Sequence, residues 1–353
     1  MKRCVKCVLS ERTPYIEFDS NGICNYCKTY KQFDYYGEEK LQEILNRHRN
    51  ASGNHDCIVN ISGGRDSSYA LLKLARDYGM KVLAVNYQNP FTHKQAKENI
   101  RNITQVLGVD LVQFKLKDCL HEEILKRNIK AWSKRPTAAM IPVMCVGCKI
   151  IWRKILKIAR KYDIHLIVNG GNPLEYTAFK KELLKVSRDA GLKSTYLNNI
   201  RGLLGEVLKN ISYISLKHLS TTIEAFLFAN QYSIGSRVIG HRVEVVDLFH
   251  FVKWNEREVV SRIKTELNWS CPAEPNSTWR FDCEISHLKD YLYLKTIGMT
   301  EKDDFYSKMI REDLISREDA LMRLKEENKL HMDTVETVLN KVRLNIPELS
   351  RNL

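Results

Sequence analysis

Proline and glycine are scarce in this sequence, which contains 8 and 16 of them among 353 residues. Collagen-like and low-complexity chains are rich in both residues, so the composition excludes those classes. The sequence also lacks an apolar run long enough to span a membrane, and its first ten residues lack the apolar segment of a signal peptide. We therefore expect a folded cytoplasmic protein without membrane insertion.

Acidic residues are in the minority, with 42 of them against 56 lysines and arginines, and the formal net charge is +14. A positive surface attracts anionic partners of several kinds, so the charge alone does not identify nucleic acid. The ten cysteines come without a secretory signal, and reducing compartments disfavour disulfides. Metal binding is therefore the first interpretation of the cysteines, although we expect Cys57 and Cys119 to be ordinary core residues.

Short apolar segments alternate with amphipathic ones, which predicts an α/β fold with a doubly wound parallel sheet. We expect an N-terminal module over residues 1–35, a main domain over 50–250 with a helical insertion at about 174–232, and a helical region over 251–353. The strands are predicted at Asp56–Ile61, Lys81–Asn86, Val109–Leu116, Ile164–Asn169 and Val243–Leu248. The helices are predicted at Ser67–Tyr78, Thr92–Leu107, Lys149–Tyr162, Glu256–Leu267, Lys289–Lys295 and Arg317–Arg343.

The N-terminal module contains two Cys-x-x-Cys pairs, Cys4 with Cys7 and Cys24 with Cys27, separated by 16 residues. This spacing is typical of a zinc ribbon, in which four thiolates surround one tetrahedral ion. A closed shell of four ligands leaves no open position for a substrate. We therefore predict a structural zinc site here, and four unrelated core cysteines are the less favoured alternative.

The segment SGGRDSS at residues 62–68 follows an apolar strand and opens a helix. Its glycines allow the backbone to approach an anion, and a helix N-terminus supplies free N–H groups and a positive dipole end. These features predict a phosphate-binding loop, which differs from the G-x-x-x-x-G-K-[ST] pattern of the P-loop. A chance Ser-Gly-Gly turn is the plainer alternative.

This loop resembles the SGGxDS PP-loop of the ATP pyrophosphatase superfamily, whose members cleave ATP to AMP and pyrophosphate. The resemblance implies that ATP is bound as its magnesium complex and that Asn86, at the end of the next strand, lies near the adenine. The ATP-binding residues that it implies are Ser62, Gly63, Gly64, Asp66, Ser67, Ser68, Asn86 and Gly170. The implied catalytic residues are Arg65, Asp66 and Ser67.

The segment IVNGGNPLE at residues 167–175 is similar to a Gly-x-Asn segment that lies beside the nucleotide in PP-loop enzymes. We accordingly expect Asn172 and Glu175 to contact the substrate, although an ordinary turn would have the same composition. Arg280 is a third candidate substrate residue, since a guanidinium pairs well with phosphate or carboxylate. A structural ion pair is an equally reasonable role for it.

Cys145 and Cys148 form a further Cys-x-x-Cys pair before a predicted helix, and Cys283 lies in a late loop. Such a pair is ambiguous between a redox site, half a metal site and buried thiols. In thiolating PP-loop enzymes, a central Cys-x-x-Cys pair and a distant cysteine bind an iron–sulfur cluster. The resemblance therefore makes these three cysteines candidate cluster ligands.

The ribbon with TPYIEFDSNGICNYC, the loop SGGRDSSYALL and the tail REDLISREDAL together resemble the N-acetyl sugar amidotransferase family of bacterial surface polysaccharide (lipopolysaccharide) synthesis. The resemblance implies that the acetamido group of an activated nucleotide sugar is converted to an acetamidine through an adenylated intermediate. A separate glutaminase would supply the ammonia, because the sequence has no Gly-x-Cys-x-Gly nucleophile turn.

Two departures keep other functions open. Arg65 stands where many such amidotransferases have lysine, and the set of Cys145, Cys148 and Cys283 is more typical of sulfur insertion. The main alternative is an ATP-dependent thiolation enzyme with an iron–sulfur cluster that acts on tRNA or a small molecule, and only this interpretation makes nucleic acid a partner. A non-catalytic zinc-ribbon protein that binds nucleic acid is a third alternative.

Overall fold

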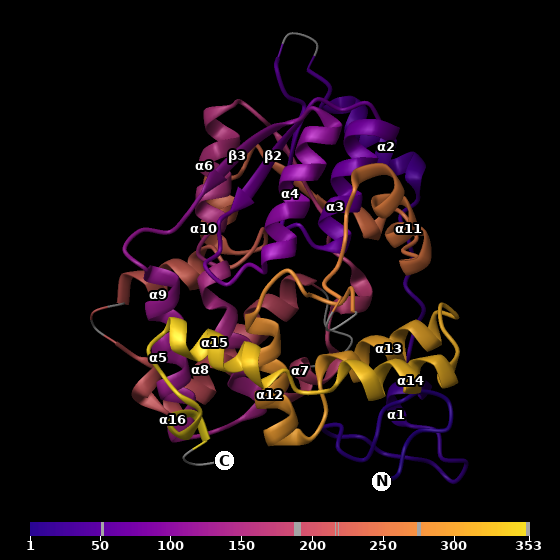
Figure 1. The fold of residues 1–353 in the computed structure, drawn as a ribbon, viewed down its shortest axis with the longest axis vertical. Coiled ribbons are helices and arrows are strands. Elements are labelled where there is room, and N and C mark those ends of the chain that lie inside the picture. Colours follow the sequence, from indigo (N-terminus) through magenta and orange to yellow (C-terminus); the bar gives the residue numbers. More distant parts are fainter. Residues whose placement is uncertain (51–52, 187–191, 216, 218, 274–276, 351–353) are drawn as a thin grey trace.

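The computed structural model describes residues 1–50, 53–186, 192–215, 217, 219–273 and 277–350, and it places a parallel sheet above a helical region (Figure 1). The sheet has five strands in the order β3-β2-β1-β4-β5, and every neighbouring pair is parallel. This arrangement confirms the predicted fold class. The strands are β1 (Cys57–Asn60), β2 (Val82–Tyr87), β3 (Asp110–Phe114), β4 (Leu166–Asn169) and β5 (Glu244–Asp247).

Helices cover both faces of the sheet, and the alternation of apolar side chains along each strand explains why. Val59 of β1 packs into the core beneath α3 (Arg65–Leu72), α4 (Lys94–Leu107) and α11 (Glu256–Leu267), whereas Ile58 packs against α6 (Trp152–Lys161). Both side chains are fully buried. Strands buried on both faces are typical of parallel sheets, which need a layer of helices on each side.

The first βαβ unit follows the predicted order, with small shifts at the helix ends. Helix α3 begins two residues before the predicted start and continues as a π-helix over Lys73–Asp77. Gly79 then ends it, and Gly108 ends α4; both glycines have positive φ angles, +59° and +61°. Glycine at these positions allows a left-handed residue at the end of a helix without steric cost.

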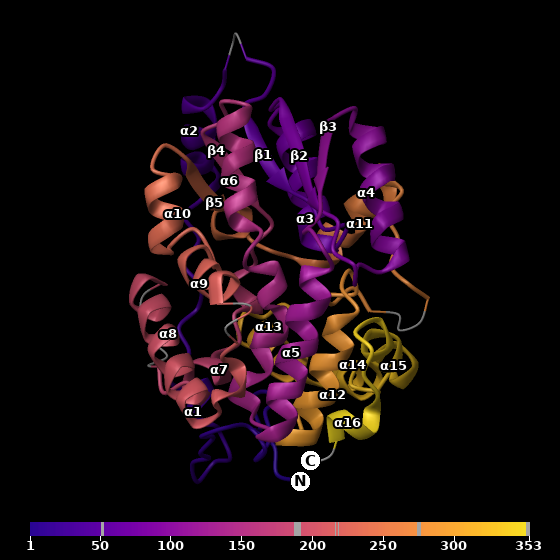
Figure 2. The ribbon, with the colours of Figure 1, turned by 90° about the vertical axis from the view of Figure 1, so that its left-hand side faces the viewer.

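The helical region lies beyond the carboxyl ends of the strands and joins segments far apart in the sequence (Figures 1 and 2). Sequence periodicity did not predict α5, α13 or the 3-10 helix Ala138–Cys148. The remaining helices are α1 (Asn25–Lys28), α2 (Glu38–Arg47), α5 (Leu120–Lys134), α7 (Ala178–Leu183), α8 (Leu192–Lys209), α9 (Leu219–Leu227), α10 (Ile234–Ile239), α12 (Ile285–Ile297), α13 (Glu301–Arg311), α14 (Arg317–Glu327), α15 (Met332–Lys341) and α16 (Ile346–Ser350).

The single long helix predicted over Arg317–Arg343 is wrong, because α14 and α15 are separate helices. The side chain of Asn328, which caps α14, accepts a hydrogen bond from Thr300 and donates one to Asp303 at the start of α13. These tertiary hydrogen bonds hold the chain at the point where it turns. A local pattern could not show them, since the partners lie more than 20 residues away.

One apolar core joins the N-terminal module, the main domain and the C-terminal region. It contains Val8, Leu71 and Phe305, one residue from each of these regions. Cys57 lies within this core as predicted, whereas Cys119 is exposed. Cys119 has a positive φ of 52° in the turn before α5, and this turn places its side chain outside the core.

In the part of the chain that the structure describes, none of the helices combines the length and hydropathy needed to cross a bilayer.

Candidate active site

The predicted phosphate-binding loop connects β1 to α3 at the carboxyl edge of the sheet. Gly63 has a φ of +81°, and a Cβ atom at this position would lie 2.1 Å from the carbonyl oxygen of Ala96. Gly64 is the N-cap of α3, and its carbonyl accepts the hydrogen bond of the Ser68 amide. The loop therefore brings the first turn of α3 close to α4, with the N–H groups of that turn directed toward an open cavity, as an anion requires.

The structure separates the serines of the loop into two roles. The hydroxyls of Ser62 and Ser67 lie 3.1 Å apart, and both residues line the cavity. Ser68 is fully buried, and its hydroxyl donates to the carbonyl of Gly64 over 2.6 Å. Ser62 and Ser67 thus face the cavity, although Ser67 also donates to the Gly64 carbonyl at 3.3 Å, while Ser68 is directed inward and holds the turn.

Arg65 is buried, and its side chain pairs with carboxylates at the wall of the cavity. Its guanidinium donates to Asp66, Glu175 and Glu256, and it stacks 4.7 Å from the ring centroid of Trp254. Burial by itself lowers the pKa of Arg65, but the three carboxylates raise it above its ordinary value overall. The contacts describe a residue that orients Asp66, whose carboxylate also accepts a hydrogen bond from the Trp254 indole at 3.0 Å.

The loop after β4 packs directly against the start of α3. A Cβ atom at Gly170 would lie 2.6 Å from the carbonyl of Asp66, so this close approach requires glycine. Asn172 is buried, and its side chain caps the short 3-10 helix Pro173–Glu175 by accepting from the amide of Leu174. Of the two residues predicted to contact substrate here, Glu175 lines the cavity, and Asn172 supports the loop.

The cavity beside the loop has a volume of about 510 Å³. One of its walls is apolar and is formed by Val85, Phe114, Ile151 and Ile155, with Asn86 at its edge. The amide of Asn86 donates to the carbonyl of Ile61 at 2.8 Å, which ties the end of β2 to the loop. A flat apolar wall next to a phosphate site can accept a nucleotide base.

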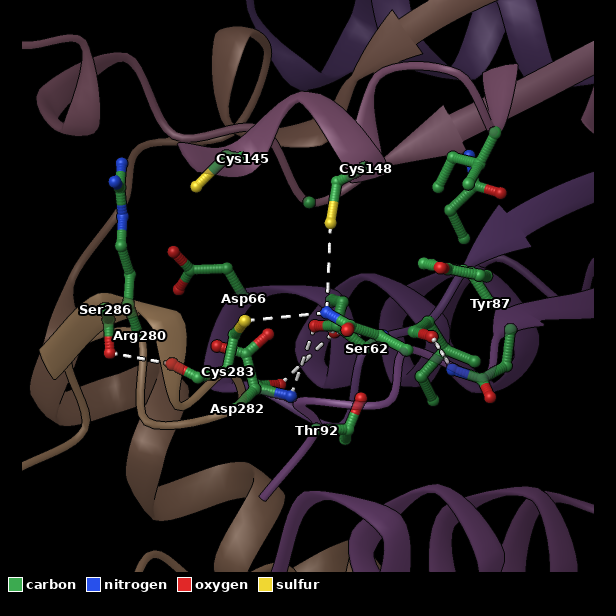
Figure 3. A pocket seen from close by; sticks show the side chains of 18 of the residues that line it. Ser62, Asp66, Tyr87, Thr92, Cys145, Cys148, Arg280, Asp282, Cys283 and Ser286 are labelled. Atoms are coloured by element: carbon green, nitrogen blue, oxygen red, sulfur yellow. Dashed lines mark hydrogen bonds between the residues drawn. The ribbon is translucent and has the colours of Figure 1, made fainter. Parts of the chain in front are cut away.

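Three cysteines line this cavity: Cys145 and Cys148 lie on one side of it in Figure 3, and Cys283 lies beside Asp282, near Ser62 of the loop. Cys145 and Cys148 come from the 3-10 helix, and Cys283 comes from the segment before α12; the side-chain amide of Asn89 donates to the sulfurs of Cys148 and Cys283 at 3.8 and 3.5 Å. Burial is the main cause that raises the pKa of Cys148 to about 12. Cavity position alone does not assign them a ligand, and buried thiols stay protonated without a metal.

The four ribbon cysteines lie in a different place, at the foot of the molecule. Their sulfur atoms all lie within 4.8 Å of one another, with 3.9 Å between Cys4 and Cys27 and 3.8 Å between Cys7 and Cys24. Thiolates that bind one zinc ion tetrahedrally at about 2.3 Å lie about 3.8 Å apart. The geometry fits a single metal ion, and among the described residues this is the one group of cysteine, histidine and carboxylate ligands that is close enough to do so.

Other cavity residues had no recognised signal in the sequence. Asp282 is one of them: its carboxylate forms a hydrogen bond with Ser62, and burial is the main cause of its raised pKa. Asn89 and Lys289 are two more. The segment of Asp282 lies beside the loop because the His93 amide donates to the Asp282 carbonyl at 3.1 Å, and the position of Asp282 next to Cys283 is a clue that the sequence did contain.

No family model matches the chain. An uncharacterized protein of Methanocaldococcus jannaschii is 27% identical over 195 residues, which are 53% of this chain and 66% of the relative. A probable tRNA sulfurtransferase of Staphylococcus saprophyticus is 29% identical over 116 residues, which are 33% of this chain and 27% of the relative. The chain thus spans less than two thirds of each of these curated relatives.

Three solved structures are similar to this chain at low identity and with TM-scores below 0.5. An NMN synthetase from Francisella tularensis is 13% identical with a TM-score of 0.39, over 85% of this chain and 97% of that one. A U34-tRNA thiolase from Methanococcus maripaludis with a 4Fe-4S cluster is 17% identical with a TM-score of 0.35, over 100% and 99%. An ammonia-dependent NAD synthetase from Campylobacter jejuni is 16% identical with a TM-score of 0.29, over 60% and 93%. Similarities at these identities and TM-scores assign no role to any residue of this chain.

Proposed function

We propose that this chain is an ATP-dependent amidotransferase that converts the acetamido group of an activated sugar into an acetamidine. ATP would bind with its phosphates at Ser62 and Ser67 and its base against the apolar wall that includes Phe114. The preorganised N–H groups at the start of α3 would stabilise the negative charge that develops on the phosphates. A magnesium ion bound with ATP would supply further charge neutralisation.

The proposed reaction has two steps. The amide oxygen of the sugar attacks the α-phosphorus of ATP, the bond to the β-phosphate oxygen breaks, and pyrophosphate leaves. Ammonia then adds to the activated carbon, and AMP leaves with the former amide oxygen, so that the product is an acetamidinium group. The cavity can hold the reacting atoms close together, which supplies much of the rate enhancement in such transfers.

One observation carries this proposal: the three motifs on which the family resemblance rests form one contact network. Arg311, in the tail motif REDLISREDAL, donates to sulfur atoms of the ribbon. Two residues beyond this motif, Arg323 of α14 pairs with Glu256, which in turn pairs with Arg65 of the phosphate-binding loop. Ribbon, tail and loop therefore belong to a single architecture, which supports a resemblance to a whole enzyme of this family.

The sources of ammonia and of structural metal follow from the same proposal. We propose a separate glutaminase as the ammonia donor and zinc as the ion that the ribbon holds through Cys4, Cys7, Cys24 and Cys27. A nucleotide sugar is the proposed substrate, and the cytoplasm is the proposed location. Asp66, held by Arg65 and Trp254, is the proposed catalytic carboxylate.

The test is product analysis with ATP, ammonium and a panel of N-acetylated nucleotide sugars. The proposal requires AMP and pyrophosphate, a product slightly lighter than the substrate, and transfer of oxygen-18 from a labelled acetamido group to AMP. Ser67→Ala should lower AMP formation at least tenfold, because one hydrogen-bond donor to a reacting group contributes about that much or more. Ser261→Ala, on the exposed side of α11, is the matched control. Formation of ADP would refute the proposal.

A second function is favoured by the meeting of Cys145, Cys148 and Cys283 in the same cavity. Three thiolates can hold an iron–sulfur cluster and leave one iron free, and such a cluster would supply sulfur for an ATP-dependent thiolation. The partial match to a probable tRNA sulfurtransferase agrees with this alternative. Iron and acid-labile sulfide in protein purified without oxygen, both lost in Cys148→Ala, would favour thiolation; zinc without iron would favour amidotransfer.

A further inference from the structure

A group of buried cations surrounds one carboxylate at the end of the cavity near Cys145. Glu301, at the start of α13, is 3% exposed and pairs with Lys180 at 2.5 Å, Arg280 at 2.6 Å and Lys289 at 2.8 Å. The three cations come from α7, the loop before α12, and α12 itself. Arg280 also pairs with Glu175 at 3.2 Å, so its charge is compensated there, and Lys180 and Lys289 share Glu301.

The three cations differ in what they can still bind. Arg280 already donates to Glu175 and Glu301 and to the carbonyl of Glu175, so its planar fork is engaged. Lys180 does not line the cavity, whereas Lys289 does. An ammonium group has three donors, and within the described ranges Glu301 accounts for one of those of Lys289.

A second polar residue lies on the same face of α12 as Lys289. Ser286 lies one turn earlier on this helix and also lines the cavity, near Arg280 and below Cys145 in Figure 3. Burial lowers the pKa of Lys289, but Glu301 and Cys145 raise it overall, so the ammonium group stays charged. The Ser286 hydroxyl donates to the carbonyl of Cys283 at 2.8 Å, so Lys289 is the charged donor at this end of the cavity.

We propose that this end of the cavity, where Lys289 lies beside Ser286 and Arg280, binds an anionic group of the substrate through the Lys289 ammonium group, either a carboxylate or a phosphate. The inference rests on the proposed function and makes it more specific, because the acceptor sugar would carry its negative charge close to the reacting acetamido group. The opposite end of the cavity, with Ser62 and Ser67, takes the phosphates of ATP. One cavity thus has two separate anion-binding ends.

Cys145 provides a chemical probe of the proposed subsite. It lines the same cavity as Lys289 and Arg280. Iodoacetate and iodoacetamide are similar in shape and differ in charge, and both react with the same thiolate, so the ratio of their rates reports the local preference for an anion. Cys119, which is exposed, is an internal reference in the same chain.

The experiment measures both alkylation rates at each cysteine by peptide mass spectrometry of the full chain, with the loop filled by magnesium and α,β-methylene-ATP. The iodoacetate to iodoacetamide ratio should be roughly tenfold higher at Cys145 than at Cys119, because a charged cleft concentrates the anion. Lys289→Gln should abolish this preference and Lys289→Arg should keep it. Lys295→Gln, an exposed lysine of the same helix, should leave it unchanged.

Equal ratios at the two cysteines in the wild-type protein would overturn the proposal, and so would a Cys145 that reacts with neither reagent, since the subsite must be open. A preference that survives in a folded Lys289→Gln protein would also overturn it. Protection of Cys145 by inorganic phosphate indicates a phosphoryl group on the substrate, and protection by acetate indicates a carboxylate. Failure of AMP formation would refute the proposed function without changing these ratios.

Discussion

The guanidinium of Arg311 donates to the sulfur of Cys27 over 3.3 Å, although the two residues are 284 positions apart in the chain. A second donor of the same guanidinium lies 3.4 Å from the sulfur of Cys7. A metal site of four thiolates has a net negative charge, and a buried arginine beside it compensates part of this charge. The C-terminal region therefore completes the environment of the N-terminal ribbon.

Arg311→Met should weaken the ribbon. We expect a loss of roughly 3 kcal/mol in the free energy of unfolding, because the variant leaves buried thiolate charge without its partner. The protein should also release its metal at a lower chelator concentration, as measured with a colorimetric zinc indicator. Arg257→Met changes an exposed arginine of α11 and is the matched control. Unchanged zinc retention in Arg311→Met would show that the hydrogen bonds to sulfur do not support the site.

Gly63 and Gly79 both have positive φ angles but differ in the space around them. Alanine substitutions at the two positions therefore distinguish the cost of a left-handed backbone from the cost of a steric clash. Gly79→Ala meets no atom within 4 Å and should cost about 1 kcal/mol for the left-handed conformation alone. Gly63→Ala would place a Cβ atom 2.1 Å from the carbonyl of Ala96, so its cost should be clearly larger. Urea denaturation measures both, and similar values would contradict the close packing of the loop on α4.

Glu256 should make stability depend on pH in the acidic range. Burial alone raises its pKa, but the hydrogen bond from Arg323 and the charges of Arg65 and Arg323 lower it from 4.5 to about 2. The folded state therefore binds this proton less readily than the unfolded state, and the stabilisation present above about pH 4.5 is lost as the pH falls toward 2.

The measurement is urea denaturation of the wild type and of Glu256→Gln between pH 3 and 7. The variant should be less stable at neutral pH, and the difference from the wild type should shrink as the pH decreases. Glu318→Gln, which changes an exposed glutamate of α14, should leave the profile unchanged. A constant difference at all pH values would mean that Glu256 does not titrate with a lowered pKa.

Gly147 should be essential for the position of the cavity cysteines. It lies between Cys145 and Cys148, and a Cβ atom there would lie 2.1 Å from the ring of the buried His121. We expect Gly147→Ala to cost about 2 kcal/mol through overpacking. Gly205→Ala, in α8 with no atom within 4 Å, should be neutral or slightly stabilising. A fully stable Gly147→Ala protein would show that this turn can move away from His121.

The sheet around the phosphate-binding loop and the N-terminal ribbon could largely be predicted from the sequence, because their signals are local. The strand, loop and helix around Ser62 occur in the expected order, and the paired cysteines at Cys4 and Cys24 do converge as their spacing indicates. Strand periodicity and turn chemistry act between residues that are neighbours in the chain. Such signals remain visible whatever the rest of the protein does.

The helical half was harder to predict, since its elements are held by distant partners. Asn328 ends α14 through hydrogen bonds to residues at the start of α13, and Cys119 is exposed in a turn where Asp118 and Cys119 both have positive φ angles. Neither effect leaves a periodic signal. The helical insertion at about 174–232 was predicted without bounds for its individual helices. Part of it, residues 187–191, 216 and 218, lies outside the described residues.

The sequence by itself determined the chemistry that is available: a thiol-rich ribbon, a loop with free N–H groups, and an excess of cationic side chains. The tertiary structure decided which of these residues act together. It turned Arg65 into the protein, brought Cys283 to Cys145 and Cys148, and gathered Lys180, Arg280 and Lys289 around Glu301. The physical reason is that ion pairs and cavity walls join residues by distance in space, which packing of the whole chain sets.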